Sequence, residues 1–266
     1  MTTLAVANIS YRYKGAVRDT LSEVSFSVSQ GDRLAIIGKN GCGKSTILKC
    51  MAGLLLPRNG QILLDNRDNT AFSRRERARM IAYVPQASGR LAPLFSVHDF
   101  VSLGRFPYQG FFALKSSYDL NVVRSALELT DTTALSDRLL PTLSGGELQR
   151  VYLAAAVAQE SNILLLDEPM TFLDPEHEVH LQEALDRIHA EQNTTIISVT
   201  HDINLALNRH SHIAALVNGR LHFFGTTQEF RMKSLELLSE IFTIPFTSAS
   251  TKQGAEPFLV PESFLV

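Results

Sequence analysis

The residues best suited to chemistry in this sequence lie in two glycine-rich stretches, each at the start of a predicted helix. The first, residues 38–46, reads GKNGCGKST and follows an apolar run at 33–37. It matches the pattern G-x-x-x-x-G-K-[ST], in which glycines let backbone N–H groups curl around phosphates at a helix N-terminus. The pattern predicts that Lys44 reaches the β- and γ-phosphates of a nucleotide and that Ser45 binds Mg²⁺. The residues predicted to bind nucleotide here are Gly38, Asn40, Gly41, Cys42, Gly43, Lys44, Ser45 and Thr46.

A second set of candidate residues ends an apolar run at 163–166, where Asp167 and Glu168 follow in the string NILLLDEP. In open α/β sheets, ligands bind at the carboxyl ends of the strands, so both carboxylates are expected at the binding edge. We predict that Asp167 holds Mg²⁺ through water, because Mg²⁺ keeps several waters in protein sites. One carboxylate suffices for the metal, which leaves Glu168 to orient or deprotonate a water molecule.

The second glycine-rich stretch, residues 143–150, reads LSGGELQR. Ser144 and Glu147 have the S-x-x-E spacing of a capping box, in which each side chain bonds the other residue's backbone N–H. Gly145 and Gly146 then leave backbone N–H groups accessible at the positive end of the helix, which suits an anion. A capped helix alone does not require two consecutive glycines. The sequence therefore predicts a second anion site.

These motifs need strands and helices to position them. Short apolar runs, as at 163–166 and 195–199, are typical of strands buried on both faces of a parallel sheet. Short β-rich segments bounded by turn residues come first, and a long helical region splits the strands, so the predicted fold class is α/β. The predicted strands are 4–9, 24–28, 33–37, 61–64, 80–84, 163–166 and 195–199, and the predicted helical parts are 45–55, 96–158 with a loop-rich part at 104–117, and 177–191.

Length, composition and charge limit the class of protein. The chain has 266 residues, of which 45% are hydrophobic and 20% charged, as is typical of a globular protein with a sizeable core. A net charge of −2 gives no overall field for nucleic acid or an anionic membrane. No apolar run approaches the ~18 residues of a membrane span, and residues 1–4 lack the pattern of a signal peptide. Cys42 and Cys50 are too far apart along one helix for a disulfide, which suits a reducing compartment.

Together, the motifs at 38–46, 143–150 and 162–169 resemble those of the ATP-binding subunit of ABC transporters. LSGGELQR is similar to the signature motif of that family, which other P-loop ATPases lack. The resemblance covers nearly the whole chain. It implies a P-loop NTPase (RecA-like) core with an N-terminal antiparallel β subdomain and an inserted helical subdomain. We expect a single ABC ATPase domain over 1–266, with the core, β subdomain and C-terminal tail at 1–95 and 159–266 and the helical signature subdomain at 96–158.

The resemblance also implies how the two glycine-rich stretches cooperate. In the family, the signature stretch contacts the γ-phosphate of ATP held by the other subunit, so a homodimer would share two ATP molecules through Ser144, Gly145 and Gly146. Asp174, in FLDP, matches the aspartate that bridges the two subunits. Gln86 matches the glutamine that senses Mg²⁺ and water and links the core to the helical lobe. ATP and Mg²⁺ are the expected cofactors.

Further positions carry over from the family. His201, in VTHD, matches the histidine that would hold the γ-phosphate and position water near Glu168. Tyr13 is our choice for the ring that stacks on adenine, with Tyr11 as the alternative and plain strand packing as another explanation. Met170 stands where the family commonly has Thr, and we expect this to affect how the dimer relays hydrolysis but not to remove activity. The predicted catalytic residues are Gln86, Glu168 and His201, and the predicted Mg²⁺ ligands are Ser45, Gln86 and Asp167.

Three further strings narrow the family. They are VSLGRFPYQG at 101–110, TFLDPEHEVHL at 171–181 and EPFLVPESF at 256–264. They resemble importer ATPases that serve iron–siderophore, haem and vitamin B12 permeases, which implies ATP-driven import of a ferric siderophore or a similar iron or corrin chelate. The expected partners are a separate membrane permease and, indirectly, a substrate-binding protein, with no nucleic acid. The expected location is the cytoplasmic face of the inner membrane, with the permease bound at a groove near Gln86.

Other functions remain compatible with the shared motifs. A soluble ABC ATPase of the iron–sulfur assembly type would not be expected to carry LGRFPY, and an exporter ATPase is opposed only by the three strings. The repair and translation types need a long coiled-coil insert or two tandem cassettes, neither of which is seen. His177 and His180 share a helix face without a third ligand nearby in sequence, so we expect no metal there. The arginines at 74, 75, 77 and 79 are expected on a solvated helix near the permease surface.

Overall fold

A computed structural model of the chain describes residues 3–86, 94–109, 116–249 and 258–264. The chain divides into two compact units. The first, the helical unit, contains Ser29–Gly31 and Arg67–Ile196. The second, the phosphate-loop unit, contains Thr3–Val28, Asp32–Asn66 and Ile197–Val266. The boundary between the two units falls inside strand β8, Thr195–Val199.

The phosphate-loop unit begins with antiparallel strands. β1, Leu4–Tyr11, pairs on one side with β2, Leu21–Val28, and on the other with β4, Asn59–Leu64. Buried and exposed side chains alternate along most of β2, because successive residues of a strand point to opposite faces. The N-terminal antiparallel β subdomain expected from the sequence is therefore present.

A second group of strands in this unit leads into the first glycine-rich stretch. β3, Arg33–Gly38, runs parallel to β9, His212–Val217, which pairs antiparallel with β10, Arg220–Thr226. Five of the six residues of β3 are buried, as expected for a strand covered on both faces. The remaining elements of the unit are α1, Lys44–Met51; α7, Ile203–Arg209; α8, Thr227–Met232; α9, Ser234–Phe242; β11, Phe246–Ala249; and β12, Phe258–Pro261, which pairs with β11.

Helix α1 ends earlier than the sequence predicts. We expected a helix over 45–55, whereas α1 ends at Met51. Gly53 adopts a left-handed φ of 67°, and its N–H donates to the carbonyl of Cys50, while the N–H of Leu54 donates to that of Lys49. These two bonds form the Schellman motif, which closes a helix at a glycine. The prediction was wrong because Leu54 continues the apolar pattern although it is 61% exposed and lies beyond the helix.

The helical unit contains a pair of parallel strands. β6, Ile81–Val84, pairs in parallel with β7, Ile163–Asp167, and all five residues of β7 are buried. The strand predicted at 80–84 therefore starts one residue later, because Met80 is the last residue of α2, Arg74–Met80. The helix expected from the arginine-rich segment is confirmed, and α2 has no buried residue.

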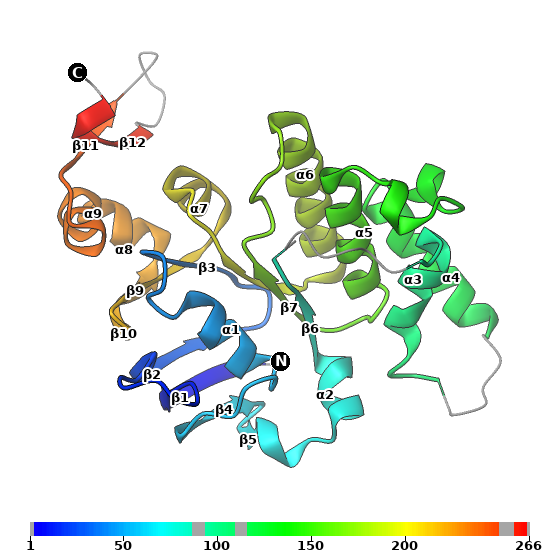
Figure 1. Ribbon diagram of the computed structural model, residues 1–266, viewed down its shortest axis with the longest axis horizontal. Helices are drawn as coiled ribbons and strands as arrows, with labels where there is room; N and C mark the ends of the chain where they lie inside the picture. Colours follow the sequence, from blue (N-terminus) through cyan, green and yellow to red (C-terminus); the bar gives the residue numbers. More distant parts are fainter. Residues whose placement is uncertain (1–2, 87–93, 110–115, 250–257, 265–266) are drawn as a thin grey trace. The chain divides into compact units, whose positions relative to one another are not determined.

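The helices of this unit pack as one group. α5 contacts α3, α4 and α6, and Figure 1 shows α3, α4 and α5 in green beside one another. Their apolar side chains join those of β6 and β7 in a single core cluster. This arrangement fixes α5 through a buried face, so its N-terminus has a defined position. The helices are α3, Val97–Ser102; α4, Ser117–Leu129; α5, Gly145–Val157; and α6, Pro175–Gln192.

The remaining segments are short. The loop-rich part predicted at 104–117 opens with the 3₁₀ turn η2, Leu103–Arg105, and residues 110–115 within it lie outside the described residues. Residues 256–257 of the C-terminal string also lie outside them. Across the described segments, we find no helix with both the length and the apolar character needed to cross a bilayer. The other short elements are β5, Arg67–Asp68; η1, Asn69–Ala71; η3, Thr133–Leu135; η4, Leu140–Thr142; and η5, Glu262–Phe264.

Candidate nucleotide-binding site

The first glycine-rich stretch connects β3 to α1 through backbone that only glycine adopts readily. Gly38, Gly41 and Gly43 have φ angles of 146°, 77° and 108°. A Cβ on Gly38 would lie 2.4 Å from the carbonyl oxygen of Leu216, and one on Gly43 would lie 2.7 Å from Cδ2 of Leu21. A Cβ on Gly41 would meet nothing within 4 Å. The loop is therefore held against the unit at both ends and faces open space in its middle.

Lys44 folds back over this loop. Its side-chain Nζ donates to the carbonyls of Gly38 and Lys39 at 2.8 and 3.0 Å, and the residue is 5% exposed. Helix α1 begins at an N-cap glycine, Gly43, which makes no side-chain cap. A positive charge and an uncapped helix start then share one loop, which is the arrangement that binds phosphate.

Cys42 lies in the loop as a packing residue. It is buried, and its Sγ would lie 2.8 Å from a Cβ on Gly38. Burial raises the pKa of the Cys42 thiol, and the nearby Lys44 charge only partly offsets this. Because the thiolate is the reactive form, the thiol is chemically quiet here.

Two other predicted residues belong to this unit. The hydroxyl of Tyr13 lies 3.2 Å from Oγ1 of Thr46, and its ring is met edge-on by that of Tyr11, with the centroids 4.9 Å apart. Tyr13 is 41% exposed, so a ring face beside the start of α1 remains accessible. His201 follows β8 in a turn whose Thr200 N–H donates to the carbonyl of Ile36 in β3. This contact places His201 at the same strand edge as the phosphate loop.

In the helical unit, the register of β6 and β7 brings Gln86 to Glu168. Val84 stands opposite Leu166 in this parallel pair. Gln86 and Glu168 each lie two residues further along the chain, just beyond the carboxyl ends of the two strands. There, Nε2 of Gln86 donates to Oε2 of Glu168 at 2.8 Å. Parallel pairing thus brings together two predicted residues that are 82 positions apart.

Asp167 closes β7 in a buried position. It is 3% exposed, and its Oδ2 accepts a hydrogen bond from the hydroxyl of Tyr83 at 3.0 Å. Sequence reasoning missed Tyr83, because only strand register reveals the contact. The described residues hold no group of three or more His, Cys, Asp or Glu side chains arranged for a metal. One carboxylate with phosphates and water suits Mg²⁺, so the donor chemistry at Asp167 fits that ion.

The turn after β7 adopts unusual backbone angles. Glu168 and Phe172 have φ angles of 50° and 68°, which side-chain-bearing residues rarely adopt and which cluster at functional sites. The N–H of Thr171 donates to the Glu168 carbonyl at 3.2 Å, and its Oγ1 donates to Oε2 of Glu168 at 3.3 Å. Thr171 was also missed. Its place three residues after Glu168 is the only sequence signal that could have indicated it.

The second glycine-rich stretch starts α5 with the predicted capping box. Oγ of Ser144 accepts the N–H of Glu147 at 3.2 Å, and Oε2 of Glu147 accepts the N–H of Ser144 at 2.7 Å. The latter bond lowers the pKa of the Glu147 carboxyl. A Cβ on Gly145 would meet nothing within 4 Å, whereas one on Gly146 would lie 1.9 Å from Cδ2 of His177. The capping box is confirmed, and the two glycines differ in surroundings.

His177 connects this helix start to the start of α6. Its Nδ1 lies 2.7 Å from Oδ1 of Asp174, which also accepts the His177 N–H and caps α6. The Nε2 of His177 lies 3.5 Å from Oγ of Ser144. His180 has a weaker contact, 3.9 Å from the Glu176 carboxylate. The structure thus brings two predicted residues, Ser144 and Asp174, to one histidine.

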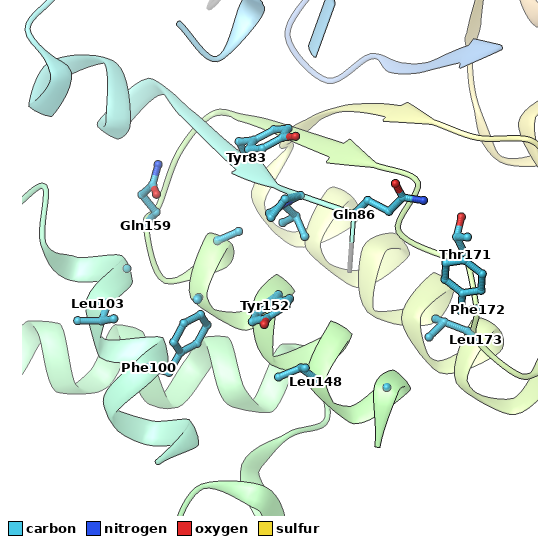
Figure 2. A pocket seen from close by; sticks show the side chains of 16 residues that line it. Tyr83, Gln86, Phe100, Leu103, Leu148, Tyr152, Gln159, Thr171, Phe172 and Leu173 are labelled. Carbon is cyan, nitrogen blue, oxygen red and sulfur yellow. The ribbon is translucent and has the colours of Figure 1, made fainter. Parts of the chain in front are cut away.

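A groove of about 710 Å³ in the helical unit adjoins the Gln86–Glu168 contact. Figure 2 shows its lining, in which rings and apolar chains from α3, α5 and the segment after β7 face the groove, with Gln86 at one end. None of the described residues that line it is charged. Such a lining suits an apolar partner segment with few charges. Labelled lining residues include Gln86, Phe100, Leu103, Leu148, Tyr152 and Phe172.

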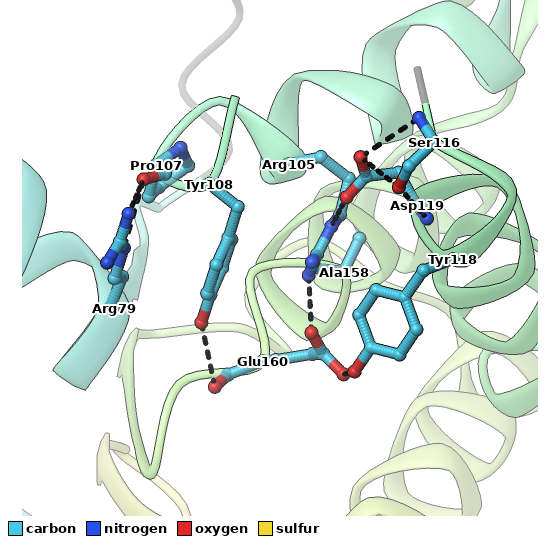
Figure 3. A network of polar contacts seen from close by, with 9 residues as sticks. All are labelled: Arg79, Arg105, Pro107, Tyr108, Ser116, Tyr118, Asp119, Ala158 and Glu160. Atoms are coloured by element: carbon cyan, nitrogen blue, oxygen red, sulfur yellow. Dashed lines mark hydrogen bonds and ion pairs between the residues drawn. The ribbon is translucent and has the colours of Figure 1, made fainter. Parts of the chain in front are cut away.

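The string LGRFPY, residues 103–108 of the helical unit, contains a buried arginine. Arg105 is 1% exposed and donates to Asp119 at 2.8 Å and to Glu160 and the Ala158 carbonyl at 2.7 Å (Figure 3). Its guanidinium also lies over the ring of Tyr108, 4.2 Å from the centroid. The string thus joins the end of α5 to the start of α4. No structural role for LGRFPY follows from its spacing, whereas the structure shows that its arginine bonds both α4 and the end of α5.

A residue of the same string and the residue after the string accept hydrogen bonds from two arginines of the arginine-rich helix α2. Arg79 donates to the carbonyl of Pro107 at 3.0 and 2.8 Å, and Arg75 donates to that of Gln109 (Figure 3 shows the former). Arg77 donates to the carbonyl of Asn69. Instead of being merely solvated, these arginines hold neighbouring backbone in place.

A strand, a glycine loop and a helix joined in this way define a nucleotide-binding P-loop protein. Residues 21–171 match the family model described as ABC transporter. The iron(3+)-hydroxamate import ATP-binding protein FhuC of Bacillus subtilis (strain 168) is 35% identical over 244 residues, which cover 92% of this chain and 89% of FhuC. The chain belongs to the ABC transporter family, and its place there is that of an ATP-binding, ATP-hydrolysing subunit.

Two solved structures agree with this assignment. One is an ABC transporter described as of the metal-chelate type, in an inward-facing conformation, with a TM-score of 0.83, 29% identity and full coverage of both chains. The other is a dimeric structure of the bacterial ABC transporter cassette MJ0796, with a TM-score of 0.75 and 27% identity over 84% of this chain and 98% of that one. The fold expected from the sequence is that of these proteins.

Proposed function

We propose that this chain is the ATPase subunit of an importer for a ferric siderophore or a similar iron or corrin chelate. The observation that carries the proposal is the uncharged groove beside the Gln86–Glu168 contact, in a chain similar over most of its length to FhuC. A groove next to a hydrolytic carboxylate lets a bound partner affect hydrolysis. The metal-chelate type of the first solved structure supports the same class of cargo. In this proposal the chain does not touch the cargo.

The residues of the phosphate-loop unit bind the nucleotide in this proposal. Backbone N–H groups of 38–46 and the Lys44 ammonium hold the phosphates, and the ring of Tyr13 stacks on adenine. Ser45, Gln86 and Asp167 would hold Mg²⁺. When bound, Mg²⁺ offsets phosphate charge and polarises the phosphoryl group.

Three residues carry the hydrolytic chemistry. The carboxylate of Glu168 orients and deprotonates the attacking water. The imidazole of His201 donates to the γ-phosphate as negative charge develops there. The amide of Gln86 connects the groove to Glu168, with which it already shares a hydrogen bond. Hydrolysis then depends on geometry that both the nucleotide and the groove influence.

The chain acts as a homodimer in this proposal. Ser144, Gly145 and Gly146 close on the γ-phosphate of ATP held by the other copy, while Asp174 bridges the two copies. The dimeric MJ0796 cassette supports this arrangement. We assign the signature subdomain to 96–158 and the core to 1–95 and 159–266. Two ATP molecules draw the copies together, and hydrolysis lets them separate.

The permease occupies the groove, at the cytoplasmic face of the inner membrane. The lining favours a short helix that presents apolar side chains, because aromatic and aliphatic groups from α3 and α5 dominate it. A substrate-binding protein delivers the cargo to the permease and does not contact this chain.

The test is a co-purification with tagged Glu168→Gln. This variant should bind ATP yet hydrolyse it at least ~100-fold more slowly, as expected for loss of a positioned base. It should dimerise with ATP in light scattering, whereas Glu168→Gln combined with Ser144→Arg should stay monomeric. From membranes solubilised with ATP and Mg²⁺, it should recover a protein with many membrane spans.

Other outcomes identify the alternatives. Recovery with a cytosolic scaffold alone would indicate the iron–sulfur assembly type, and a permease of export topology would indicate an exporter. Near-normal hydrolysis by Glu168→Gln would show that the base is misassigned. Monomers in both ATP-bound variants would contradict the shared site.

A further inference from the structure

We propose that Thr171 is a positioning residue for the Glu168 carboxylate, and that it gives the groove a second connection, beside Gln86, to hydrolysis. The inference rests on the proposed role of Glu168 as base. It assigns a function to the segment in which Met170 departs from the family, and to a threonine that no motif identifies.

One oxygen of Glu168 accepts hydrogen bonds from two side chains. Oε2 accepts Nε2 of Gln86 at 2.8 Å and Oγ1 of Thr171 at 3.3 Å. Two donors on a single oxygen orient the plane of the carboxylate, because each hydrogen bond to a charged acceptor prefers a defined direction. Without them, the flexible glutamate side chain would sample more rotamers.

The backbone supports the same arrangement. Glu168 has a left-handed φ of 50°, and the turn is closed by the Thr171 N–H, which donates to the Glu168 carbonyl at 3.2 Å. The turn therefore holds the Thr171 side chain beside the carboxylate it bonds. A residue kept in a costly backbone conformation persists only where surrounding contacts fix it, and Thr171 supplies two of them.

Met170 anchors this turn by packing. Its side chain packs against the apolar core cluster of the helical unit. The next residue, Thr171, places a hydroxyl on Glu168. The departure from the family's usual Thr thus leaves a hydroxyl donor in the turn.

The groove reaches both donors. Gln86 and Thr171 both line it, as do Phe172 and Leu173, and Figure 2 shows the labelled side chains at one end of the lining. A segment seated there contacts the two groups that orient Glu168 before it could contact Glu168 itself. Groove occupancy and carboxylate orientation are therefore coupled through two side chains.

The experiment compares Thr171→Val with Thr171→Ser in the full complex with the permease. Valine keeps the shape and removes the donor, so kcat for ATP hydrolysis should fall about tenfold, in line with losing a hydrogen bond to a charged acceptor. The KM for ATP should stay within about twofold, because Thr171 does not belong to the nucleotide-binding loop. Serine keeps the hydroxyl and should restore most of the rate.

Thr70→Val is the matched control. The Thr70 hydroxyl also donates to a carboxylate, that of Asp68 at 2.6 Å, but it lies on an exposed turn away from the groove. Its kcat should be unchanged. Should Thr171→Val fail to fold, Thr171→Ala carries the same expectation, with folding checked by ATP binding.

A combined variant separates this inference from the proposed function. If Thr171 acts through Glu168, Thr171→Val should not slow single-turnover hydrolysis further in the Glu168→Gln background. The role of Thr171 would be overturned if the two substitutions slowed hydrolysis by the product of their separate factors, or if Thr171→Val alone had a normal kcat. In either case the loss of hydrolysis in Glu168→Gln would still stand. Normal hydrolysis by Glu168→Gln would instead show that the base assigned in the proposed function is wrong.

Discussion

The two glycine-rich helix starts both contain glycines, but they require them for different physical reasons. At α1, Gly38 and Gly43 have φ angles open only to glycine, and backbone atoms or a leucine occupy the place of a Cβ. At α5, Gly146 is required by a neighbouring side chain, the His177 ring, and Gly145 has no neighbour that a Cβ would meet. At α1 the loop's shape and its phosphate chemistry are inseparable. At α5 they can be separated by mutation.

The largest effect is expected at α1. Gly43→Ala would place a Cβ at a φ of 108° and 2.7 Å from Leu21, so the free energy of unfolding should fall by about 3 kcal/mol. ATP affinity should fall with it, because the same backbone is proposed to bind phosphate. Urea unfolding and nucleotide titration measure the two. A loss of unfolding free energy below about 1 kcal/mol would contradict the claim that backbone shape requires this glycine.

An intermediate effect is expected at Gly146. Gly146→Ala must move the Cβ of His177 as well as its ring, so overpacking should outweigh the gain in helix propensity and lower the unfolding free energy by about 2 kcal/mol. In a His177→Gly background the same change should become stabilising. The background variant replaces His177 by glycine and not by alanine, because the His177 Cβ itself lies 2.6 Å from the new methyl. The same sign in both backgrounds would show that His177 is not the cause.

The smallest effect on stability is expected at Gly145. Gly145→Ala adds a methyl where nothing lies within 4 Å, so helix propensity should raise the unfolding free energy by about 0.5 kcal/mol. ATP hydrolysis should nevertheless fall, because the methyl intrudes where the partner's γ-phosphate is proposed to bind. Parallel urea unfolding and steady-state hydrolysis test this. Unchanged hydrolysis would remove Gly145 from the proposed site.

Local patterns predicted the elements that carry the motifs. The phosphate loop, the capping box at Ser144 and the strand ending at Asp167 all follow from spacing within a few residues. The end of α1 did not, because apolar residues continue the periodic pattern beyond Gly53. Residues 202–249 hold α7 to α9 and three strands for which we made no prediction.

Several contacts between distant segments could not be predicted from the sequence. Tyr83 meets Asp167 across 84 positions, and Arg105 meets Glu160 across 55. Such pairs depend on strand register and helix packing, which a single sequence does not specify. His177 was considered only as a metal ligand, and its actual contacts with Ser144 and Asp174 depend on how α5 and α6 pack.

The cluster around Arg105 has one cation for two carboxylates, Asp119 and Glu160. Because of this ratio of charges, the three positions differ in how readily each tolerates substitution during evolution. Either acid can be exchanged while the other still neutralises the guanidinium. Loss of the arginine removes the cation from both acids at once, leaving Asp119 with Ser116 and Glu160 with Tyr118 as neutral donors. A lysine cannot replace the fork of donors of the arginine. Relatives that abandon this arginine should therefore have abandoned both acids beforehand, one at a time.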